Sequence, residues 1–305
     1  MSIRYQIAKG LIKLTGIKKL FQLPQEELLK KAEQMNRKRQ FRMPADDKAR
    51  YADRMIQGCH CLTMETQPQK SNRALLFLFG GGMVIGSDAG DLKVARNMGK
   101  RSGRDVWFPY YPLCTDHSML EATQMVYETY RQMLSDYRAE DIAVLGFSSG
   151  AGLALNLITY INLRGNELPM PGRMVLLSPG TCPADEAEFA DMKALNDRDV
   201  LVDAAYMKTA GSIMAHGDPN VPRQLICITQ GNFTGAPLTH FYYGGDEVLS
   251  ACAKPFAAAY DKVGAKYTMH IEPGMCHCYP MLPYFPESKK AYEEIIGLLF
   301  QDRTA

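Results

Sequence analysis

The chain contains no uninterrupted apolar run that approaches the roughly 18 to 20 residues required to span a membrane as a helix. It also lacks an excess of either charge, since 35 Lys and Arg residues against 33 Asp and Glu residues leave a net charge of +2. This balance gives no reason to expect nucleic acid as a partner. Internal repeats and low-complexity segments are absent as well. The composition is that of an ordinary globular protein. A length of 305 residues is sufficient for one α/β domain, with or without a small accessory element.

The eight cysteines are scattered along the chain, which suits reduced thiols in a cytoplasmic protein better than a disulfide framework. Two Cys-His-Cys triplets, at residues 59–61 and 276–278, raise the question of zinc. Each triplet would need two further ligands at a suitable distance, and its spacing is wrong for the common ligand pairs. We therefore expect a cytoplasmic protein that holds no metal.

The N-terminal segment combines an apolar helical period with basic side chains. The apolar positions at roughly helical spacing are Ile3, Ile7, Leu11, Leu14, Ile17 and Phe21. Lysines interrupt what would have to be the apolar centre of a signal peptide, and no small-residue cleavage site follows, so we do not expect export. Such a helix either packs its apolar face on the main domain, which we favour, or lies on an anionic membrane surface.

Beyond about residue 57, short apolar runs alternate with amphipathic helical patterns. The predicted strands cover residues 61–65, 74–79, 105–111, 142–146, 174–178, 239–244 and 266–272. The predicted helices cover residues 118–137, 151–163, 249–263 and 287–300. Alternation of this kind predicts an α/β fold whose mostly parallel sheet is covered by helices on both faces.

Two segments fall outside this alternation. Residues 1–55 have the pattern of helices broken at Pro24 and Pro44. The second segment lies between the strands that end at Ser178 and begin at Thr239, and a structureless loop of that length is uncommon in a compact domain. We expect residues 183–232 to form a helical insertion in a core of residues 56–305, and to build a cap together with residues 1–55.

The apolar run 142–145 leads into Gly146-Phe147-Ser148-Ser149-Gly150, and a small-residue, helix-prone segment follows. A Gly-x-Ser-x-Gly turn between a strand and a helix is typical of a nucleophile elbow. The elbow holds its serine in a strained backbone conformation, so the residues on both sides must lack bulk, as Gly146 and Gly150 do. We therefore predict that Ser148 is a nucleophile.

A second glycine-rich segment, Gly80-Gly81-Gly82, follows the predicted strand 74–79. Glycines there let backbone N–H groups approach an oxyanion with no side chain in the way, and each such donor contributes roughly 3 to 4 kcal/mol in the transition state. A dinucleotide-binding loop is excluded, because no Gly-x-Gly-x-x-Gly pattern with a following acidic ribose contact is present. A flexible connection is the remaining alternative.

The glycine segment, the elbow and the C-terminal part of the chain resemble the hormone-sensitive-lipase-like branch of the α/β-hydrolases, over roughly residues 74 to 300. Residues 111–117, Tyr-Pro-Leu-Cys-Thr-Asp-His, stand where that family usually has Tyr-Arg-Leu-Ala-Pro-Glu-His. The resemblance implies an α/β-hydrolase fold, a triad in the order Ser, Asp, His, and oxyanion donors at Gly81, Gly82 and Ser149. It also implies a homodimer. The chain has Phe79 where the family usually has histidine, so we expect packing to hold this loop.

Candidates for the acid and the base lie downstream. The predicted strand 239–244 is followed closely by Asp246 and Glu247, at the place where such a fold positions its orienting acid. Asp246 matches the aspartate of the family and is preferred, while Glu247 is the rival, with a solvated charge at a helix start as its alternative role. His277 lies in a Gly-Met-x-His-x-Tyr segment that matches the family's histidine, so we predict it to be the base.

These residues predict a serine hydrolase of carboxylic esters, with Ser148, Asp246 and His277 as the catalytic triad and no cofactor. Met83 and Phe147 are expected to line an apolar pocket for a small-molecule substrate, a short- to medium-chain acyl or acetyl ester. Two alternatives stay open: a non-catalytic relative that binds a small ligand, and a lipid hydrolase that acts at a membrane surface. Amide hydrolysis by the same triad also stays open.

Overall fold

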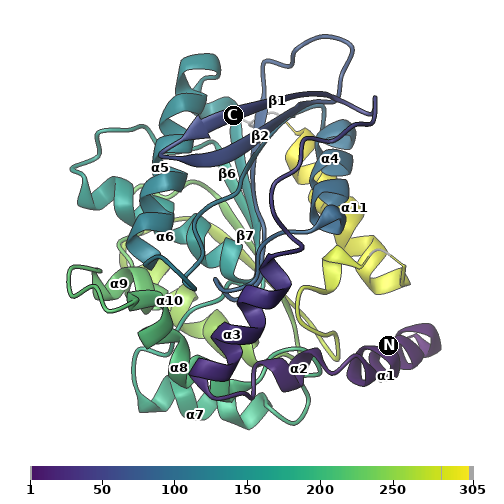
Figure 1. The fold of residues 1–305 in the computed structure, drawn as a ribbon, viewed down its shortest axis with the longest axis vertical. Helices are drawn as coiled ribbons and strands as arrows, with labels where there is room; N and C mark the ends of the chain where they lie inside the picture. Colours follow the sequence, from purple (N-terminus) through teal and green to yellow (C-terminus); the bar gives the residue numbers. More distant parts are fainter. Residues whose placement is uncertain (1, 283, 302–305) are drawn as a thin grey trace.

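Strands from most of the chain form one sheet in the computed structural model, which describes residues 2–282 and 284–301 (Figure 1). They are β1 (Arg50–Ile56), β2 (Cys59–Glu65), β3 (Ala74–Leu78), β4 (Asp105–Pro109), β5 (Ile142–Phe147), β6 (Arg173–Leu177), β7 (Thr239–Gly244) and β8 (Tyr267–Glu272). Their order across the sheet is β1-β2-β4-β3-β5-β6-β7-β8. β2 pairs antiparallel with β1 and β4, and every other pair is parallel. The predicted α/β class and the mostly parallel sheet are confirmed.

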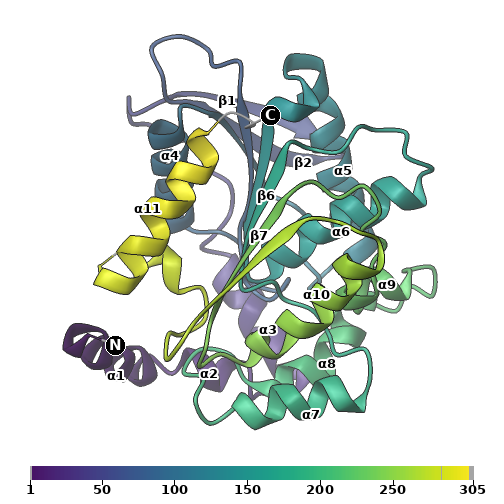
Figure 2. The ribbon, with the colours of Figure 1, turned by 180° about the vertical axis from the view of Figure 1, so that it is seen from behind.

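Helices cover both faces of this sheet because its central strands are apolar on both sides. Every residue of β3 and of β4 is buried. α4 (Ala89–Ser102) and α11 (Pro286–Phe300) lie together on one face (Figures 1 and 2). α5 (Met119–Asp136), α6 (Ser149–Leu163) and α10 (Ala253–Lys262) lie on the other face. The carboxyl ends of the parallel strands are thereby left as the place where loops from different parts of the chain converge.

Two groups of short helices gather at that end of the sheet (Figure 1). They are α1 (Ile3–Leu14), α2 (Ile17–Leu20) and α3 (Gln25–Asn36) from the N-terminus, and α7 (Glu186–Leu195), α8 (Ala204–Ala215) and α9 (Arg223–Ile226) from the segment between β6 and β7. The two groups contact each other, since the ring of Phe21 lies 5.0 Å from that of Tyr206 and Gln22 Nε2 donates to Asp203 Oδ2 at 2.8 Å. We call these six helices the cap. β1 pairs in the sheet from Arg50 onward, so the helical part ends before the predicted boundary at residue 55.

The N-terminal helix is present, but it does not pack as we expected. Its inward side carries Tyr5, which is fully buried and lies 5.6 Å from the ring of Phe285. Three members of the predicted apolar face remain largely exposed instead, namely Ile7, Leu11 and Leu14. The expectation that this face packs on the main domain is therefore wrong for these three residues, whereas Phe21 packs against the core as expected. No helix among the described residues is long and apolar enough to cross a membrane.

Candidate active site

Ser148 sits at a sharp turn between β5 and α6, with a backbone φ of 53° and ψ of −128°. This left-handed φ is strained for a residue with a side chain. The turn depends on its glycines, because a Cβ atom on Gly146 would lie 2.4 Å from the Gly150 carbonyl oxygen and one on Gly150 would lie 2.1 Å from that of Phe79. The predicted elbow is thus present, and it requires glycine at these two positions because a side chain there would clash with the backbone.

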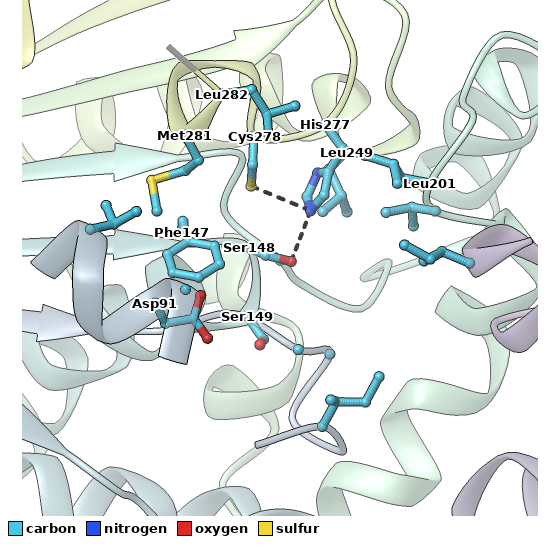
Figure 3. Close-up of a pocket in the computed structure, with 18 of the residues that line it drawn as sticks. Asp91, Phe147, Ser148, Ser149, Leu201, Leu249, His277, Cys278, Met281 and Leu282 are labelled. Atoms are coloured by element: carbon cyan, nitrogen blue, oxygen red, sulfur yellow. Dashed lines mark hydrogen bonds between the residues drawn. The ribbon is translucent and has the colours of Figure 1, made fainter. Parts of the chain in front are cut away.

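The Ser148 hydroxyl is in hydrogen-bond contact with His277, and Figure 3 shows the two side chains facing each other in the cavity. His277 Nε2 lies 2.9 Å from Ser148 Oγ, and its Nδ1 lies 2.5 Å from Glu247 Oε2. Glu247 is fully buried, and its other oxygen accepts hydrogen bonds from Ser178 Oγ and the Gly244 N–H, both at 2.7 Å. A serine, an imidazole and a carboxylate therefore form one continuous hydrogen-bonded chain.

The carboxylate in this chain is Glu247, so the prediction that Asp246 orients the histidine is wrong. Asp246 points away from the imidazole toward the cap, where Lys9 Nζ lies 2.6 Å and Arg198 Nη1 lies 3.7 Å from its oxygens. The two acids follow one another in a turn, so their side chains leave the backbone in different directions. The longer glutamate side chain is the one that turns inward and reaches His277.

The buried carboxylate affects the protonation of the imidazole. Burial alone lowers the pKa of His277, but Cys278 and Glu247 outweigh burial and hold this pKa well above its ordinary value. Burial raises the pKa of the Glu247 carboxyl, and contacts with His277 and Ser178 act against that rise. The pair is suited to stabilise an imidazolium after His277 takes a proton.

Replacing Glu247 with Gln is expected to lower the pKa of His277, because the neighbouring negative charge that favours the imidazolium is lost. The measurement is a pH titration of the His277 ring signals by NMR in the wild-type protein and in E247Q. We expect the wild-type midpoint to lie above the ordinary value of 6.5 and the E247Q midpoint to lie below that of the wild type. Equal midpoints would contradict the coupling, and D246N is the matched control that should titrate like the wild type.

Three residues with free backbone N–H groups among the described residues line the cavity beside Ser148. Gly81, Gly82 and Ser149 all line this cavity, and their N–H groups have no hydrogen-bond acceptor among residues 2–282 and 284–301. Gly81 has a φ of 138° and Gly82 a φ of 63°, which favour glycine. Their arrangement fits the predicted oxyanion donors, and that role stays a prediction.

Aromatic packing and the hydrogen bonds of one side chain hold the loop that carries Gly81 and Gly82. Phe79 is almost fully buried and stacks on Tyr111 at 4.2 Å, while the Tyr111 hydroxyl donates to the Phe79 carbonyl at 2.5 Å. Asn36, at the end of α3, donates to the Val84 carbonyl at 2.8 Å and accepts from the Gly86 N–H at 2.9 Å. Phe79, which stands where the family usually has histidine, therefore holds the loop by packing as expected, and Asn36 adds two hydrogen bonds that no sequence pattern indicated.

Replacing Asn36 with Ala is expected to lower kcat by about tenfold with little change in KM, because the loop that carries Gly81 and Gly82 loses two hydrogen bonds of roughly 1 kcal/mol each. The measurement is steady-state ester hydrolysis. N162A is the matched control, since the Asn162 side chain also makes two hydrogen bonds to backbone atoms, in its case to the carbonyls of Asn232 and Thr234 on a different loop. Equal losses of kcat in both variants would show that Asn36 does not act on the site specifically.

A cavity of about 1020 Å³ opens over Ser148. Its cap side is mainly apolar, with Tyr206, Met207 and Met214 from α8 among its lining residues. Phe147 lines the cavity as predicted, whereas Met83 does not. Met83 has a φ of 63° and is fully buried in the core, so the prediction for it is wrong.

Two further features near the triad escaped sequence reasoning. Cys278 Sγ lies 3.5 Å from His277 Nε2, and this nitrogen is also the one that contacts Ser148 Oγ (Figure 3). Asp199 is buried in the segment between α7 and α8 of the cap and accepts a hydrogen bond from the Val248 N–H at 2.8 Å. This bond links the cap to the loop that carries Glu247. Among the described residues, no group of three or more His, Cys, Asp or Glu side chains could hold a metal ion.

Comparison with known proteins shows which family the chain belongs to. A sequence model described as alpha/beta hydrolase fold matches residues 75–281. The chain belongs to the α/β-hydrolase family. The fold implied by the resemblance of its motifs is therefore confirmed.

Individual relatives of this α/β-hydrolase are more distant. An esterase of Acinetobacter venetianus is 26% identical over 236 residues, which make up 76% of each chain. An esterase from the bacterial hormone-sensitive lipase family has the same fold, with a TM-score of 0.76 and 21% identity over 96% of this chain and 97% of that one. A hormone-sensitive lipase from a metagenome library gives a TM-score of 0.78 and 21% identity over 98% of both chains.

Proposed function

We propose that this α/β-hydrolase is a serine esterase that cleaves carboxylic esters with short- to medium-chain acyl groups through an acyl-serine intermediate. The observation that carries the proposal is the hydrogen-bonded chain Ser148–His277–Glu247 at the floor of a largely apolar cavity. A serine hydroxyl is a weak nucleophile until a positioned base takes its proton, and His277 Nε2 is within reach of that proton.

In the proposed reaction, Ser148 Oγ attacks the ester carbonyl while His277 accepts its proton. Glu247 holds the imidazole in the required tautomer and stabilises the imidazolium. The N–H groups of Gly81, Gly82 and Ser149 bind the negative oxygen of the tetrahedral intermediate. His277 then returns the proton to the departing alcohol, which leaves an acyl group on Ser148. Water activated by His277 hydrolyses this acyl-enzyme and restores the serine.

The cavity supports a small ester as the substrate. A volume of about 1020 Å³ is at the upper end of the range of drug-sized ligand sites, and its apolar cap wall suits an alkyl or aryl group.

The eight cysteines are all free, which supports our proposal that the protein works in a reducing compartment such as the cytoplasm. The retained serine, histidine and carboxylate argue against a purely ligand-binding relative.

Hydrolysis of a p-nitrophenyl ester series from acetate to laurate tests the proposed function. We expect turnover of short and medium chains, with a decline once the acyl group exceeds the length of the cavity. A fluorophosphonate probe should label the wild-type protein and abolish its turnover, because it reacts with an activated serine. Absence of both turnover and labelling would favour the ligand-binding alternative.

A further inference from the structure

The outward face of α1 is apolar although it lies in solvent. Ile7, Leu11 and Leu14 are 62%, 60% and 82% exposed, and their spacing of four and three residues places them in one stripe along the helix. In both ribbon views α1 projects from the body of the molecule (Figures 1 and 2). We call Ile7, Leu11 and Leu14 the outer stripe.

The opposite side of α1 is already occupied by the protein. Tyr5 is buried against Phe285, and Lys9 forms an ion pair with Asp246 at 2.6 Å. The helix start is fixed as well, since the Ser2 hydroxyl donates to Glu287 at 3.1 Å. These inward contacts hold α1 with the outer stripe toward solvent.

The charged residues of the N-terminal segment that carries the outer stripe are all basic. Residues 1–23 contain five basic residues and no Asp or Glu. Lys9 and Lys18 are engaged with the body of the protein, the latter through the Asp199 carbonyl at 2.9 Å. Arg4, Lys13 and Lys19 are exposed. An exposed apolar stripe on a segment whose charges are all positive matches the acyl chains and anionic headgroups at a membrane surface.

The segment that carries the outer stripe continues to the active-site cavity. Ile17, three residues after Leu14, lines the cavity and is 44% exposed. Tyr284, next to the Phe285 that contacts α1, lines the cavity and is 77% exposed. A surface bound by α1 would therefore lie near exposed residues that line the cavity of Ser148.

A second copy of the chain is a poorer occupant of this face. A symmetric contact through α1 would bring the cations of two copies together, and like charges repel. A stripe of three side chains is also far smaller than the 20 to 30 residues per partner, roughly, of a stable interface.

We propose that the outer stripe and its flanking cations bind the surface of an anionic lipid membrane, with the cavity entrance turned toward that surface. The helix lies in the interface and does not span the bilayer. Binding needs no chemistry at Ser148, so it stands apart from the proposed esterase activity. Its consequence is access to apolar esters that are dissolved in a lipid phase.

Flotation with lipid vesicles tests the proposal. The wild-type protein should float with vesicles of phosphatidylglycerol and phosphatidylcholine and stay behind with phosphatidylcholine alone. Leu11→Gln/Leu14→Gln and Lys13→Glu/Lys19→Glu should each lower the bound fraction at least about tenfold. None of these four side chains lines the cavity, so hydrolysis of p-nitrophenyl butyrate without vesicles should be unchanged.

Matched controls change equivalent residues elsewhere. Leu163→Gln/Ile271→Gln removes two apolar side chains that are 46% and 47% exposed, and Lys30→Glu/Lys31→Glu reverses two exposed charges on α3. Both should bind like the wild type. Failure of the wild type to float, or equal binding by the α1 variants, would overturn the proposal. So would a wild-type dimer in light scattering that L11Q/L14Q converts to a monomer, since a second copy would then cover the stripe.

Discussion

Ser148→Ala is expected to lower kcat/KM for p-nitrophenyl butyrate by at least about a thousandfold. The substitution removes the hydroxyl oxygen that lies 2.9 Å from His277 Nε2 and leaves the backbone of the elbow in place. Residual turnover should reflect substrate binding and the oxyanion donors alone, which accelerate hydrolysis only modestly without a nucleophile. The measurement is steady-state hydrolysis with the variant purified free of wild-type enzyme.

Ser149→Ala is the matched control for this loss. It removes the neighbouring hydroxyl from the first turn of α6 but keeps the backbone N–H of Ser149, a residue that lines the cavity. We expect S149A to retain activity within about threefold of the wild type, since the proposed reaction uses only the backbone N–H of this residue. Similar activity of S148A and the wild type would mean that another group performs the reaction.

Glu247→Gln is expected to lower kcat/KM by about 10³- to 10⁴-fold, whereas Asp246→Asn should change it by less than about threefold. Glutamine keeps the shape of the side chain but removes the charge that stabilises the His277 imidazolium and fixes its tautomer. Asp246 instead contacts Lys9 and Arg198 at the cap, and loss of a partly exposed ion pair costs roughly 0 to 1 kcal/mol of folding free energy.

Comparison of E247Q with D246N distinguishes the roles of the two adjacent acids in catalysis. Kinetics gives the catalytic effect, and thermal unfolding shows whether either protein is merely destabilised. A large loss in D246N with a nearly normal E247Q would restore Asp246 as the orienting acid. It would also mean that the turn after β7 differs in solution from the arrangement described above.

The elbow could be predicted because its constraints are local. A strand, a strained serine and small neighbours must follow one another in sequence, and that order alone places Ser148 at the turn. The choice of acid is different, because Asp246 and Glu247 are neighbours at the same strand end. Lys9, which holds Asp246, is 237 residues away in the chain. No local pattern contains that contact, so family position decided the prediction, and it was wrong.

Other errors have similar physical causes. β1 is an edge strand with mostly exposed side chains, so it lacks the apolar run that marked the seven predicted strands. α4 was not predicted, although Asp88 and Asp91 form a capping box at its start that is readable in the sequence. The apolar period of α1 predicted a helix correctly, but it could not show which face the body of the protein covers. That depended on Tyr5 and Lys9 finding partners in distant segments.

The proposed reaction requires that Ser148 carries an acyl group during turnover. Mass spectrometry of the protein, quenched in acid during turnover of p-nitrophenyl butyrate, detects such a group. We predict that a fraction of the wild-type protein gains the mass of one butyryl group, that the modified peptide contains Ser148, and that E247Q and S148A acquire far less or none. A butyryl group on a different residue, or turnover by S148A at the wild-type rate, would contradict the account.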